Sequence, residues 1–560
     1  MLKQYFKKEI LLGAIFIILS CLTALYLPLV LRQLIDSQKA SLNFWVLFKI
    51  LGLFALQAFL LSSGTYFMAL NGENIAETKR QELTRHLMHL PLSFFHYEKS
   101  GELSSRVVND INNLGNFYVT TLPSLITSSV TIIGSVIVLF LLDWKLTLTF
   151  FIALPLLVLL LFPLSQLSQN SSEQLQEDTS RLTGQLSETF KEIELIKADS
   201  GENQRLNHLN AIITKIKQTS LKVDLIKSFV SPVGLMFLFA SIALIFTYGG
   251  QRVATGDLTI GTLISFLVYL FQLLNPVGAI GTIVTDFAKV KGATKELDRL
   301  LTIEQEDFSQ KRNTIPKGNL VLEEVSFGYQ ADQDTLSHIN MILPLGQKIA
   351  LVGPSGSGKS TLAHLLARFY QPTSGVIKLA DQDISSFSLK DWRQGLALVS
   401  QSAAVLSGSL RDNLTFGLNT TPSETDIEQA LKAAVLWEDV QKLEQGLDTF
   451  VGEGGKLLSG GQKQRLQIAK AYLKQAHLII FDEATANLDA DAEFAIGQSM
   501  KQLLHNKTAL VIAHRLSTIL DADHIYFLEN GQLTGSGSHN DLLANHSTYA
   551  RFVKEQLLMD

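Results

Sequence analysis

The sequence predicts an α-helical, six-span transmembrane domain with long cytoplasmic helical extensions, followed by an α/β domain of the phosphate-loop type. Two observations lead to this fold class. Charge-free apolar stretches crowd the first half of the chain, and short β-rich runs alternate with helical patterns in the second half. A chain of 560 residues also exceeds what one hydrophobic core supports. We expect a transmembrane domain over residues 1–305, a linker over 306–318 and a phosphate-binding domain over 319–560.

Six stretches are long enough to cross a bilayer, which takes roughly 20 apolar residues per helix. They cover residues 10–31, 45–72, 111–142, 146–172, 228–251 and 258–285, and from residue 50 in the second stretch each is free of Asp, Glu, Lys and Arg. Only a helix satisfies its own backbone inside lipid. The apolar run at the start continues to Leu31 without a small-residue cleavage pattern, so we interpret it as a retained span and not as a secretory signal.

The distribution of cations predicts the orientation of these spans. Lys3, Lys7 and Lys8 precede the first span, and the connections after the second and fourth spans are rich in Lys and Arg. The connections after the third and fifth spans are short and nearly free of cations. The positive-inside bias therefore predicts a multi-pass protein of the cell (plasma) membrane, with both termini and the second domain in the cytoplasm.

The two long cytoplasmic connections contain few glycines and many good helix formers. We interpret them as continuations of the second and fourth spans that turn over and return into the third and fifth. Two independent helical hairpins are the alternative. Either arrangement places a turn far from the membrane, near residues 99–103 and near residues 183–187, where it is positioned to touch the second domain.

The bulk composition limits the remaining function classes. The net charge of −5 gives no reason to expect a nucleic-acid partner. The single Cys21 lies inside an apolar run, so an internal disulfide framework is excluded.

A phosphate-binding loop opens the second domain. The run KIALVGPSGSGKST is an apolar strand followed by the pattern G-x-x-x-x-G-K-[ST] and then a helical run. Its glycines let backbone N–H groups surround phosphate oxygens, and the helix N-terminus adds a favourable dipole. We expect Lys359 to bridge the β- and γ-phosphates and the Ser360 hydroxyl to ligate Mg²⁺.

Two later strands end in residues suited to hydrolysis. The run HLIIFDEAT delivers Asp482 and Glu483 to the tip of a buried strand, and TALVIAH delivers His514 in the same way. Asp482 is predicted to coordinate Mg²⁺, and Glu483 to polarise the attacking water. His514 is predicted to contact the γ-phosphate and to hold Glu483 and the water in line. A solvated strand end is the structural alternative for the two acids.

The second glycine-rich stretch, LSGGQ, precedes a run with an apolar helical face. Ser459 and Gly461 therefore lie at a helix N-terminus, which is a second anion site. Chain geometry does not indicate which nucleotide this site serves.

The phosphate loop, LSGGQ, LIIFDE and the strand before His514, in this order and spacing, resemble the ATP-binding cassette (ABC) family. Six spans ahead of one cassette resemble the exporter-type half-transporters of that family, over essentially the whole chain. The resemblance implies a dimer in which the LSGGQ signature of one chain closes over the ATP held by the phosphate loop of the other. It also implies that Tyr329 stacks on adenine, that Gln401 lies in a loop joining Mg²⁺ to the membrane part, and that Asp489 lies at the dimer seam. The residues implied to bind ATP are Tyr329, Gly353, Ser355, Gly356, Ser357, Gly358, Lys359, Ser360, Thr361, Ser459, Gly460, Gly461, Gln462 and Asp489. Catalysis is assigned to Glu483, His514 and Gln401, and the metal ligands are Ser360, Gln401 and Asp482.

The expected function is ATP-driven export of an amphipathic or hydrophobic compound, drug-like or lipid-like, with ATP and Mg²⁺ as cofactors. The expected partners are a second copy of the chain or a homologous half-transporter, the lipid bilayer and the small substrate. Alternatives stay open: one half of a heterodimer handling peptides, thiols or siderophores, or an ATP-gated channel or sensor on the same scaffold.

Overall fold

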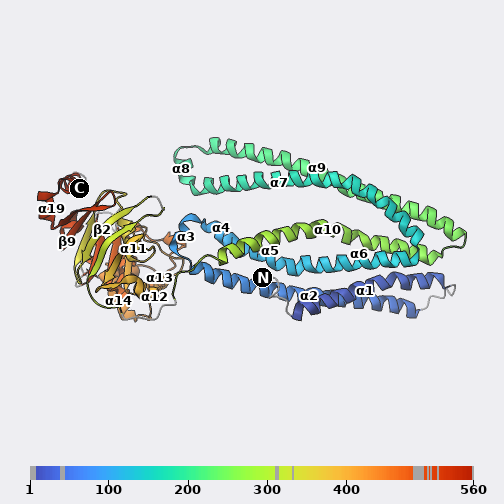
Figure 1. Cartoon of the computed structure of the whole chain (residues 1–560), viewed down its shortest axis with the longest axis horizontal. Helices are drawn as coiled ribbons and strands as arrows, with labels where there is room; N and C mark the ends of the chain where they lie inside the picture. Colours follow the sequence, from blue (N-terminus) through green and yellow to red (C-terminus); the bar gives the residue numbers. More distant parts are fainter. Residues whose placement is uncertain are drawn as a thin grey trace. The chain divides into compact units, whose positions relative to one another are not determined.

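The computed structural model describes residues 8–37, 44–308, 315–330, 333–482, 497–500, 503–504, 507–513 and 516–557. The described chain divides into two compact units (Figure 1). The helical unit runs up to Arg85 and from Ser104 to Thr302, and the second unit joins His86–Leu103 to the chain from Ile303 onward. The order of a helical unit followed by an α/β unit confirms the predicted fold class.

Long helices build the first unit because each apolar stretch must satisfy its backbone internally. They are α1 (Lys8–Asp36), α2 (Phe44–Met88), α4 (Ser100–Ser105), α5 (Ile111–Asn116), α6 (Leu122–Leu142), α7 (Trp144–Lys191), α8 (Ile193–Ala198), α9 (Glu202–Ala254) and α10 (Ile260–Leu301). Two π-helical turns, Arg106–Asp110 and Phe117–Thr121, lie within the continuous run from α4 to α6. The short helix α3 (Leu92–Tyr97) belongs to the second unit.

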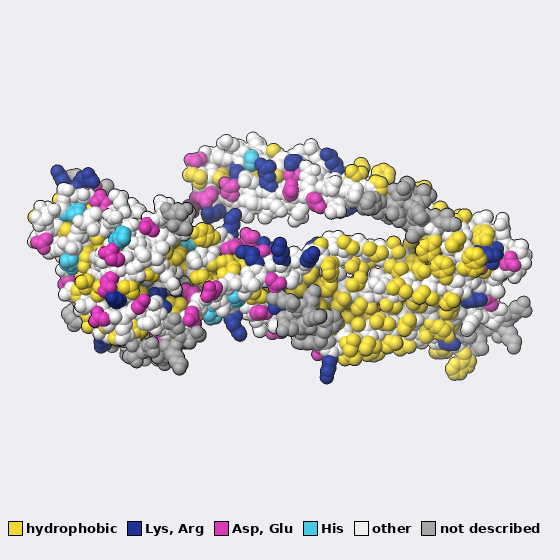
Figure 2. Space-filling view, in the orientation of Figure 1, with side chains coloured by type: hydrophobic (Ala, Val, Ile, Leu, Met, Phe, Trp, Pro, Cys, Tyr) yellow, Lys and Arg dark blue, Asp and Glu magenta, His cyan; other side chains and the backbone are white. Residues whose placement is uncertain are grey.

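Within the described residues, five helical segments are long and apolar enough to cross a membrane. They are Lys8–Asp36, Leu47–Met88, Ser100–Leu142, Leu235–Ala254 and Ile260–Leu301. The predicted span over residues 146–172 falls in α7, where the side chains of 152–162 and 164–165 lie outside the described residues. Figure 2 shows hydrophobic side chains gathered over one part of the helical unit, whereas charged side chains gather on the segments predicted to extend from the membrane.

The helices α7 and α9 form a long antiparallel arm with α8 at its tip (Figure 1). Both are continuous from an apolar part into a polar part, which confirms the continued-span interpretation over independent hairpins. The predicted turn at residues 183–187 is wrong, because these residues lie inside α7 and the chain reverses at α8 instead. The reversal ends at Ser200, which has a positive φ of 52°, and Gly201. Gly184 remains helical because contact with α9 stabilises this part of α7.

The first predicted turn, at residues 99–103, also needs correction. The chain leaves α2 at Met88, passes Pro91 and forms α3, and it breaks again at Glu98 and Lys99. The predicted turn therefore begins with a break at residue 99, but residues 100–103 already belong to α4. Pro91 precedes the first residue of α3 and has an extended backbone with φ −65° and ψ 152°. The residue before a proline disfavours the helical region, so an additional break falls there, ahead of the expected turn.

A row of hydrogen bonds joins α1 to α10 around a proline. Pro28 lies inside α1 and has no N–H to donate to the carbonyl of Ala24. Gln272 on α10 donates from Nε2 to that carbonyl oxygen at 3.2 Å. On the same face of α10, Tyr269 donates to the carbonyl of Leu25, and Ser265 donates to the carbonyl of Pro28 at 2.8 Å. The polar side chains of α10 therefore compensate a backbone defect in α1.

The two short connections of the helical unit are joined by a buried ion pair. Asp143 caps the N-terminus of α7 by accepting from Leu146 N at 2.8 Å, and its other carboxylate oxygen contacts Arg252 Nη1 at 2.5 Å. The two side chains are 10% and 15% exposed, respectively. Removing one partner of such a pair leaves an uncompensated buried charge.

We therefore expect Asp143→Ala to lower the free energy of unfolding by about 3 kcal/mol. Thermal unfolding of the purified protein in detergent measures this as a lower melting temperature. Glu192→Ala is the control, because Glu192 pairs with Lys191 at 3.4 Å and both side chains are more than half exposed. The double variant Asp143→Ala/Arg252→Ala should recover part of the loss, and an unchanged melting temperature in Asp143→Ala would contradict the assignment.

The second unit contains two sheets. Its strands are β1 (Leu320–Phe327), β2 (Leu336–Leu343), β3 (Lys348–Val352), β4 (Ser374–Leu379), β5 (Gln382–Asp383), β6 (Leu396–Val399), β7 (Leu478–Asp482), β8 (Thr508–Ile512), β9 (His524–Glu529) and β10 (Gln532–Gly537). Its helices after α3 are α11 (Lys359–Leu366), α12 (Leu389–Gln394), α13 (Leu410–Thr415), α14 (Glu424–Ala433), α15 (Trp437–Gln441), α16 (Gly460–Lys474), α18 (Leu516–Leu520), α19 (His539–Asn545) and α20 (Ser547–Leu557). The larger sheet has the order β10-β9-β3-β8-β7-β6, and all its pairs are parallel except β10 with β9. Parallel strands buried on both faces read as continuous apolar runs, which is what β3, β7 and β8 are.

Candidate nucleotide-binding site

The carboxyl ends of four neighbouring parallel strands define the candidate site. β3, β8, β7 and β6 are adjacent in the sheet, and Asp482 at the end of β7 lies opposite Ile512 at the end of β8. The phosphate loop leaves β3 at this edge, and the loop of Gln401 leaves β6 at the same edge. Ligands bind outside the carboxyl ends of the strands in open α/β sheets. The sheet therefore brings these predicted site segments to one edge.

The phosphate loop connects β3 directly to α11, which excludes a glycine-rich hairpin. A Cβ on Gly353 would lie 2.0 Å from the carbonyl oxygen of Leu528, so the backbone passes too close for any side chain. Gly358 caps α11 in the left-handed region with φ 106°. The buried Lys359 donates from Nζ to the carbonyl oxygens of Gly353 and Pro354, at 2.9 and 2.8 Å. The lysine thus lies along the inside of the loop that it is predicted to share with phosphate.

Aromatic residues line the neighbourhood of Tyr329. The Tyr329 ring is 38% exposed, and its hydroxyl lies 3.3 Å from the Thr361 hydroxyl on α11. Tyr370 meets the Tyr329 ring edge-on, with centroids 5.2 Å apart. Phe327 contacts both tyrosines at 5.0 and 5.4 Å. The structure thus places Tyr329 beside the phosphate loop with an apolar backing, as a residue that stacks on a base requires.

The LSGGQ stretch begins α16, as predicted. Ser459 is the N-cap, and it forms a capping box with Gln462: Gln462 N donates to Ser459 Oγ at 3.2 Å, and Ser459 N donates to Gln462 Oε1 at 3.0 Å. Ser459 and Gly460 are exposed, whereas Gly461 is buried. The helix N-terminus is therefore built and accessible on the surface of the unit.

The loop that carries Gln401 is attached to the same helix. Gln401 itself is exposed. Ser400 N donates to Gln467 Oε1 on α16 at 3.2 Å, and Gln467 Nε2 donates to the carbonyl of Ala404 at 3.2 Å. A displacement of the signature helix α16 therefore acts directly on the Gln401 loop.

The residues at the tip of β7 fit a Mg²⁺ ion in their donor chemistry. Ser360 offers an exposed hydroxyl at the start of α11, and Asp482 offers a carboxylate. Oxygen ligands of this kind are those that Mg²⁺ prefers. Burial lowers the pKa of His364 on α11, and the negative charge of Asp482 opposes that shift. The strand β7, which ends at Asp482, contacts α11. Glu483, Asp489 and His514 lie outside the described residues, so their assignments stay predictions.

Two contacts near Tyr329 were missed by sequence reasoning. The Tyr370 hydroxyl lies 2.9 Å from His96 Nδ1 on α3, and the Tyr97 hydroxyl lies 3.5 Å from the carbonyl oxygen of Tyr329. His96 and Tyr370 are 274 positions apart, and a local sequence pattern does not predict a contact over that separation. The only available signal was the pair of aromatic residues in ARFYQ, at the end of the helical run predicted after the phosphate loop.

Comparisons with known proteins cover both units. A family model described as the ABC transporter transmembrane region matches residues 10–277, and one described as ABC transporter matches residues 336–486. The multidrug resistance ABC transporter ATP-binding and permease protein of Lactococcus lactis subsp. lactis (strain IL1403) is 35% identical over 541 residues, 96% of this chain and 92% of the relative. The ATP-dependent lipid A-core flippase of Vibrio vulnificus (strain CMCP6) is 30% identical over 562 residues, 99% of this chain and 96% of the relative.

Among solved structures, a bacterial Atm1-family ABC exporter with ATP bound is similar with a TM-score of 0.80 and 25% identity, over 98% of each chain. The matches confirm the resemblance drawn from the motifs. They also extend the similarity over both units, from the first span to the end of the α/β part.

Proposed function

The chain belongs to the ABC transporter family, and we propose that it is an exporter-type half-transporter that works as a dimer to export amphipathic or hydrophobic compounds. Family membership makes it a membrane protein in which ATP hydrolysis is coupled to transport. The observation that carries the proposal is one chain with a phosphate loop and an exposed signature, fused to a helical membrane unit. The positive-inside bias supports a plasma-membrane protein with the nucleotide-binding domain in the cytoplasm.

Each ATP is held between two chains in this proposal. Lys359 and the loop around it bind the phosphates, and Tyr329 stacks on adenine. Ser459, Gly460, Gly461 and Gln462 of the second copy close over the γ-phosphate, with Asp489 at the seam between the copies. The exposure of Ser459 at a helix N-terminus supports this, because the anion-binding surface faces outward.

Mg²⁺ would be held by Ser360 and Asp482, with Gln401 contributing from its loop, and it would neutralise phosphate charge. Glu483 orients and deprotonates the attacking water, and His514 holds it in line with the γ-phosphate. Because ATP contacts both copies, it binds the closed pair better than the open pair. Only this difference in ATP affinity between the closed and the open pair drives the movement of the membrane helices. Each tenfold difference in affinity supplies about 1.4 kcal/mol.

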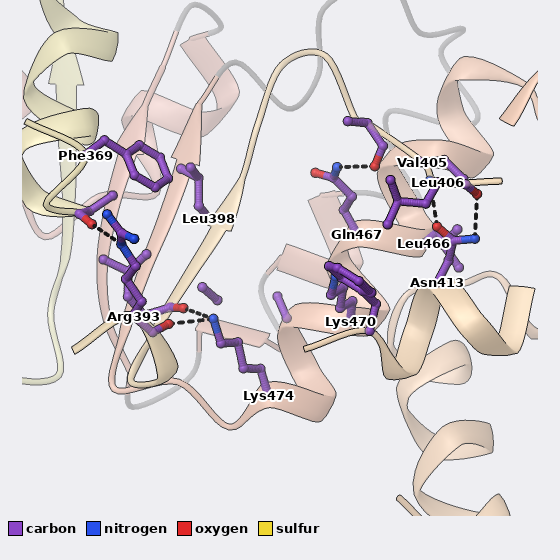
Figure 3. Close-up of a pocket in the computed structure, with 16 residues that line it drawn as sticks. Phe369, Arg393, Leu398, Val405, Leu406, Asn413, Leu466, Gln467, Lys470 and Lys474 are labelled. Atoms are coloured by element: carbon purple, nitrogen blue, oxygen red, sulfur yellow. Dashed lines mark hydrogen bonds between the residues drawn. The ribbon is translucent and has the colours of Figure 1, made fainter. Parts of the chain in front are cut away.

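A groove in the nucleotide-binding domain is suited to receive α8 of the second copy (Figure 3). The groove has a volume of about 430 Å³, and its lining includes Phe369, Leu398 and Leu406. Lys470 lies 4.9 Å over the Phe416 ring. Lys474 donates to the carbonyls of Arg393 and Leu396, and burial together with Lys470 lowers its pKa to about 8. The described lining carries three cations and no carboxylate.

The chemistry of α8 complements this groove. Ile193 and Leu195 are 39% and 60% exposed at the tip of the arm, which leaves apolar surface without cover. Glu194 adds a negative charge between them, and Glu192, which pairs with Lys191, lies beside Ile193. Lys470 and Lys474 lie on α16, whose other end is the signature, so a helix docked here moves with the ATP-closing element.

We expect Leu195→Arg to lower ATP-driven transport at least tenfold, because it places a cation against a cationic groove and removes apolar contact. ATP binding by the purified protein should stay within about twofold. Leu206→Arg is the matched control, since Leu206 is 52% exposed on the same arm but belongs to α9 and not to α8. Equal transport by both variants would contradict docking at α8.

Cargo is proposed from the membrane unit and from the relatives. The predicted spans carry no Asp, Glu, Lys, Arg or His over their apolar stretches, and such residues inside a span are the usual mark of an ion or proton path. One relative is named as a multidrug resistance transporter and another as a lipid A-core flippase. These observations favour an amphipathic or hydrophobic compound.

Transport by the purified chain alone tests the proposal. Reconstituted into inverted vesicles, the wild-type chain should accumulate a fluorescent amphiphile in an ATP-dependent manner, and Lys359→Ala should not. A chain that hydrolyses ATP only with a second half-transporter would indicate a heterodimer. ATP-gated conductance without accumulation would indicate a channel, and either result would overturn the homodimeric exporter.

A further inference from the structure

The segment after α2 is fixed to the nucleotide-binding domain of its own chain. Residues 86–103 belong to the same compact unit as that domain. Glu306 N donates to the carbonyl of His89 at 2.8 Å, and Gln305 Nε2 lies 2.9 Å from His86 Nδ1. The rings of His89 and Phe308 meet edge-on at 5.5 Å. The helix α3 therefore follows directly from a segment that is held on the domain at several points.

Tyr370 lies between α3 and the candidate base site. Its hydroxyl contacts His96 Nδ1 at 2.9 Å, and its ring meets the Tyr329 ring at an interplanar angle of 88°. The same ring contacts Phe327 and His364, at 5.4 and 6.2 Å. His364 belongs to α11, the helix that begins at Lys359. One side chain thus contacts α3, the base-stacking residue and the phosphate-loop helix.

Tyr329 has few other constraints. It follows β1 in a bend, its ring is 38% exposed, and the hydrogen bond of its hydroxyl to Thr361 is long at 3.3 Å. An exposed ring on a bend adopts several orientations unless a neighbour restricts it. The edge-on contact with Tyr370 restricts the Tyr329 ring on one side, and the bond to His96 in turn fixes Tyr370.

We propose that His96 and Tyr370 are positioning residues for the adenine base, through which α3 sets the orientation of Tyr329 and hence the ATP affinity of its own chain. The inference rests on the proposed function, because it uses the stacking role of Tyr329. The helix α3 is joined to the spanning helix α2 by only three residues, His89–Pro91. A shift of α2 therefore changes ATP affinity in the same chain, separately from the contact made by α8 on the second copy.

The test measures KM for ATP and kcat of the full-length protein in lipid nanodiscs. His96→Ala and Tyr370→Phe are each expected to raise KM about three- to tenfold, the range of one hydrogen bond, and to leave kcat within about twofold. His96→Asn should restore a KM near the wild-type value, because its amide oxygen replaces Nδ1 as the partner of the Tyr370 hydroxyl. Tyr97→Phe is the matched control: it removes a hydroxyl from the next position, whose 3.5 Å contact is too long to contribute much.

Two measurements distinguish a positioning role of His96 from a general structural role. If His96 acts through Tyr329, His96→Ala in a Tyr329→Ala background adds nothing to the loss caused by Tyr329→Ala. Competition by inorganic tripolyphosphate, which has no base, should be the same for wild type and His96→Ala. An additive loss, equal weakening of tripolyphosphate, or an unchanged KM in both His96→Ala and Tyr370→Phe would overturn the inference. Lys359→Ala distinguishes a failure of this inference from a failure of the proposed function. ATP turnover in that variant would refute the nucleotide site itself.

Discussion

Replacing Glu483 with glutamine is expected to lower ATP turnover at least about a hundredfold, because a positioned general base contributes about 10² to 10⁴. Glutamine keeps the size of the side chain and its hydrogen bonding but cannot accept the proton of the attacking water. ATP affinity should stay within about twofold, since we propose that the loop around Lys359, and not Glu483, holds the phosphates. Phosphate release and equilibrium binding of labelled ATP measure the two effects separately.

The role predicted for Glu483 rests on its neighbour in the sequence. Asp482 ends β7 at the edge of the sheet where the phosphate loop leaves β3, and Glu483 is the next residue. Glu529→Gln is a suitable control, because Glu529 ends β9, another strand of the same sheet, but leads into the turn to β10. Undiminished turnover in Glu483→Gln would refute its role and favour a solvated strand end.

Two inactive variants are expected to restore each other when they share a dimer. Lys359→Ala removes phosphate binding, and Ser459→Arg blocks the signature, so each alone should lose at least about 99% of turnover. In the mixed dimer, the intact phosphate loop of one copy faces the intact signature of the other, which rebuilds one complete site. Random pairing makes about half of the dimers mixed, with one of two sites complete, so about a quarter of the wild-type sites return.

Occlusion of labelled ATP on co-expressed, differently tagged chains measures this recovery, because occlusion requires only one complete site. Ser423→Arg controls for the loss of a helix cap, worth about 1 kcal/mol, since Ser423 forms the same capping box on α14. Sites built within single chains would give no recovery in the mixture, and the shared-site arrangement would then be wrong.

The elements that carry the candidate nucleotide site were largely predictable because their signals are local. A strand, a glycine-rich loop and a helix follow one another around Lys359, and a parallel sheet collects its strand ends at one edge whatever the rest of the chain does. The capping box of Ser459 and Gln462 is likewise a spacing of three residues. Which chain completes the site is a matter of assembly, and the residues alone left it open.

The missed features are contacts between distant parts of the chain. The turn expected at residues 183–187 was outweighed by packing of α7 along α9, and the reversal moved to α8. The pairing of Asp143 with Arg252 and of His96 with Tyr370 spans 109 and 274 positions, respectively. Each of these residues looks ordinary in its own segment, so only tertiary structure assigns it a partner.

The bridging of Ala24 by Gln272 has a consequence for how the membrane part changes shape. In hydrocarbon no water replaces a lost backbone partner, so sliding α10 past α1 would strand an amide and a carbonyl at once. We therefore expect these two helices to move together during the transport cycle. We expect the pathway to open and close at other helix contacts, where no side chain hydrogen-bonds to the backbone of the neighbouring helix.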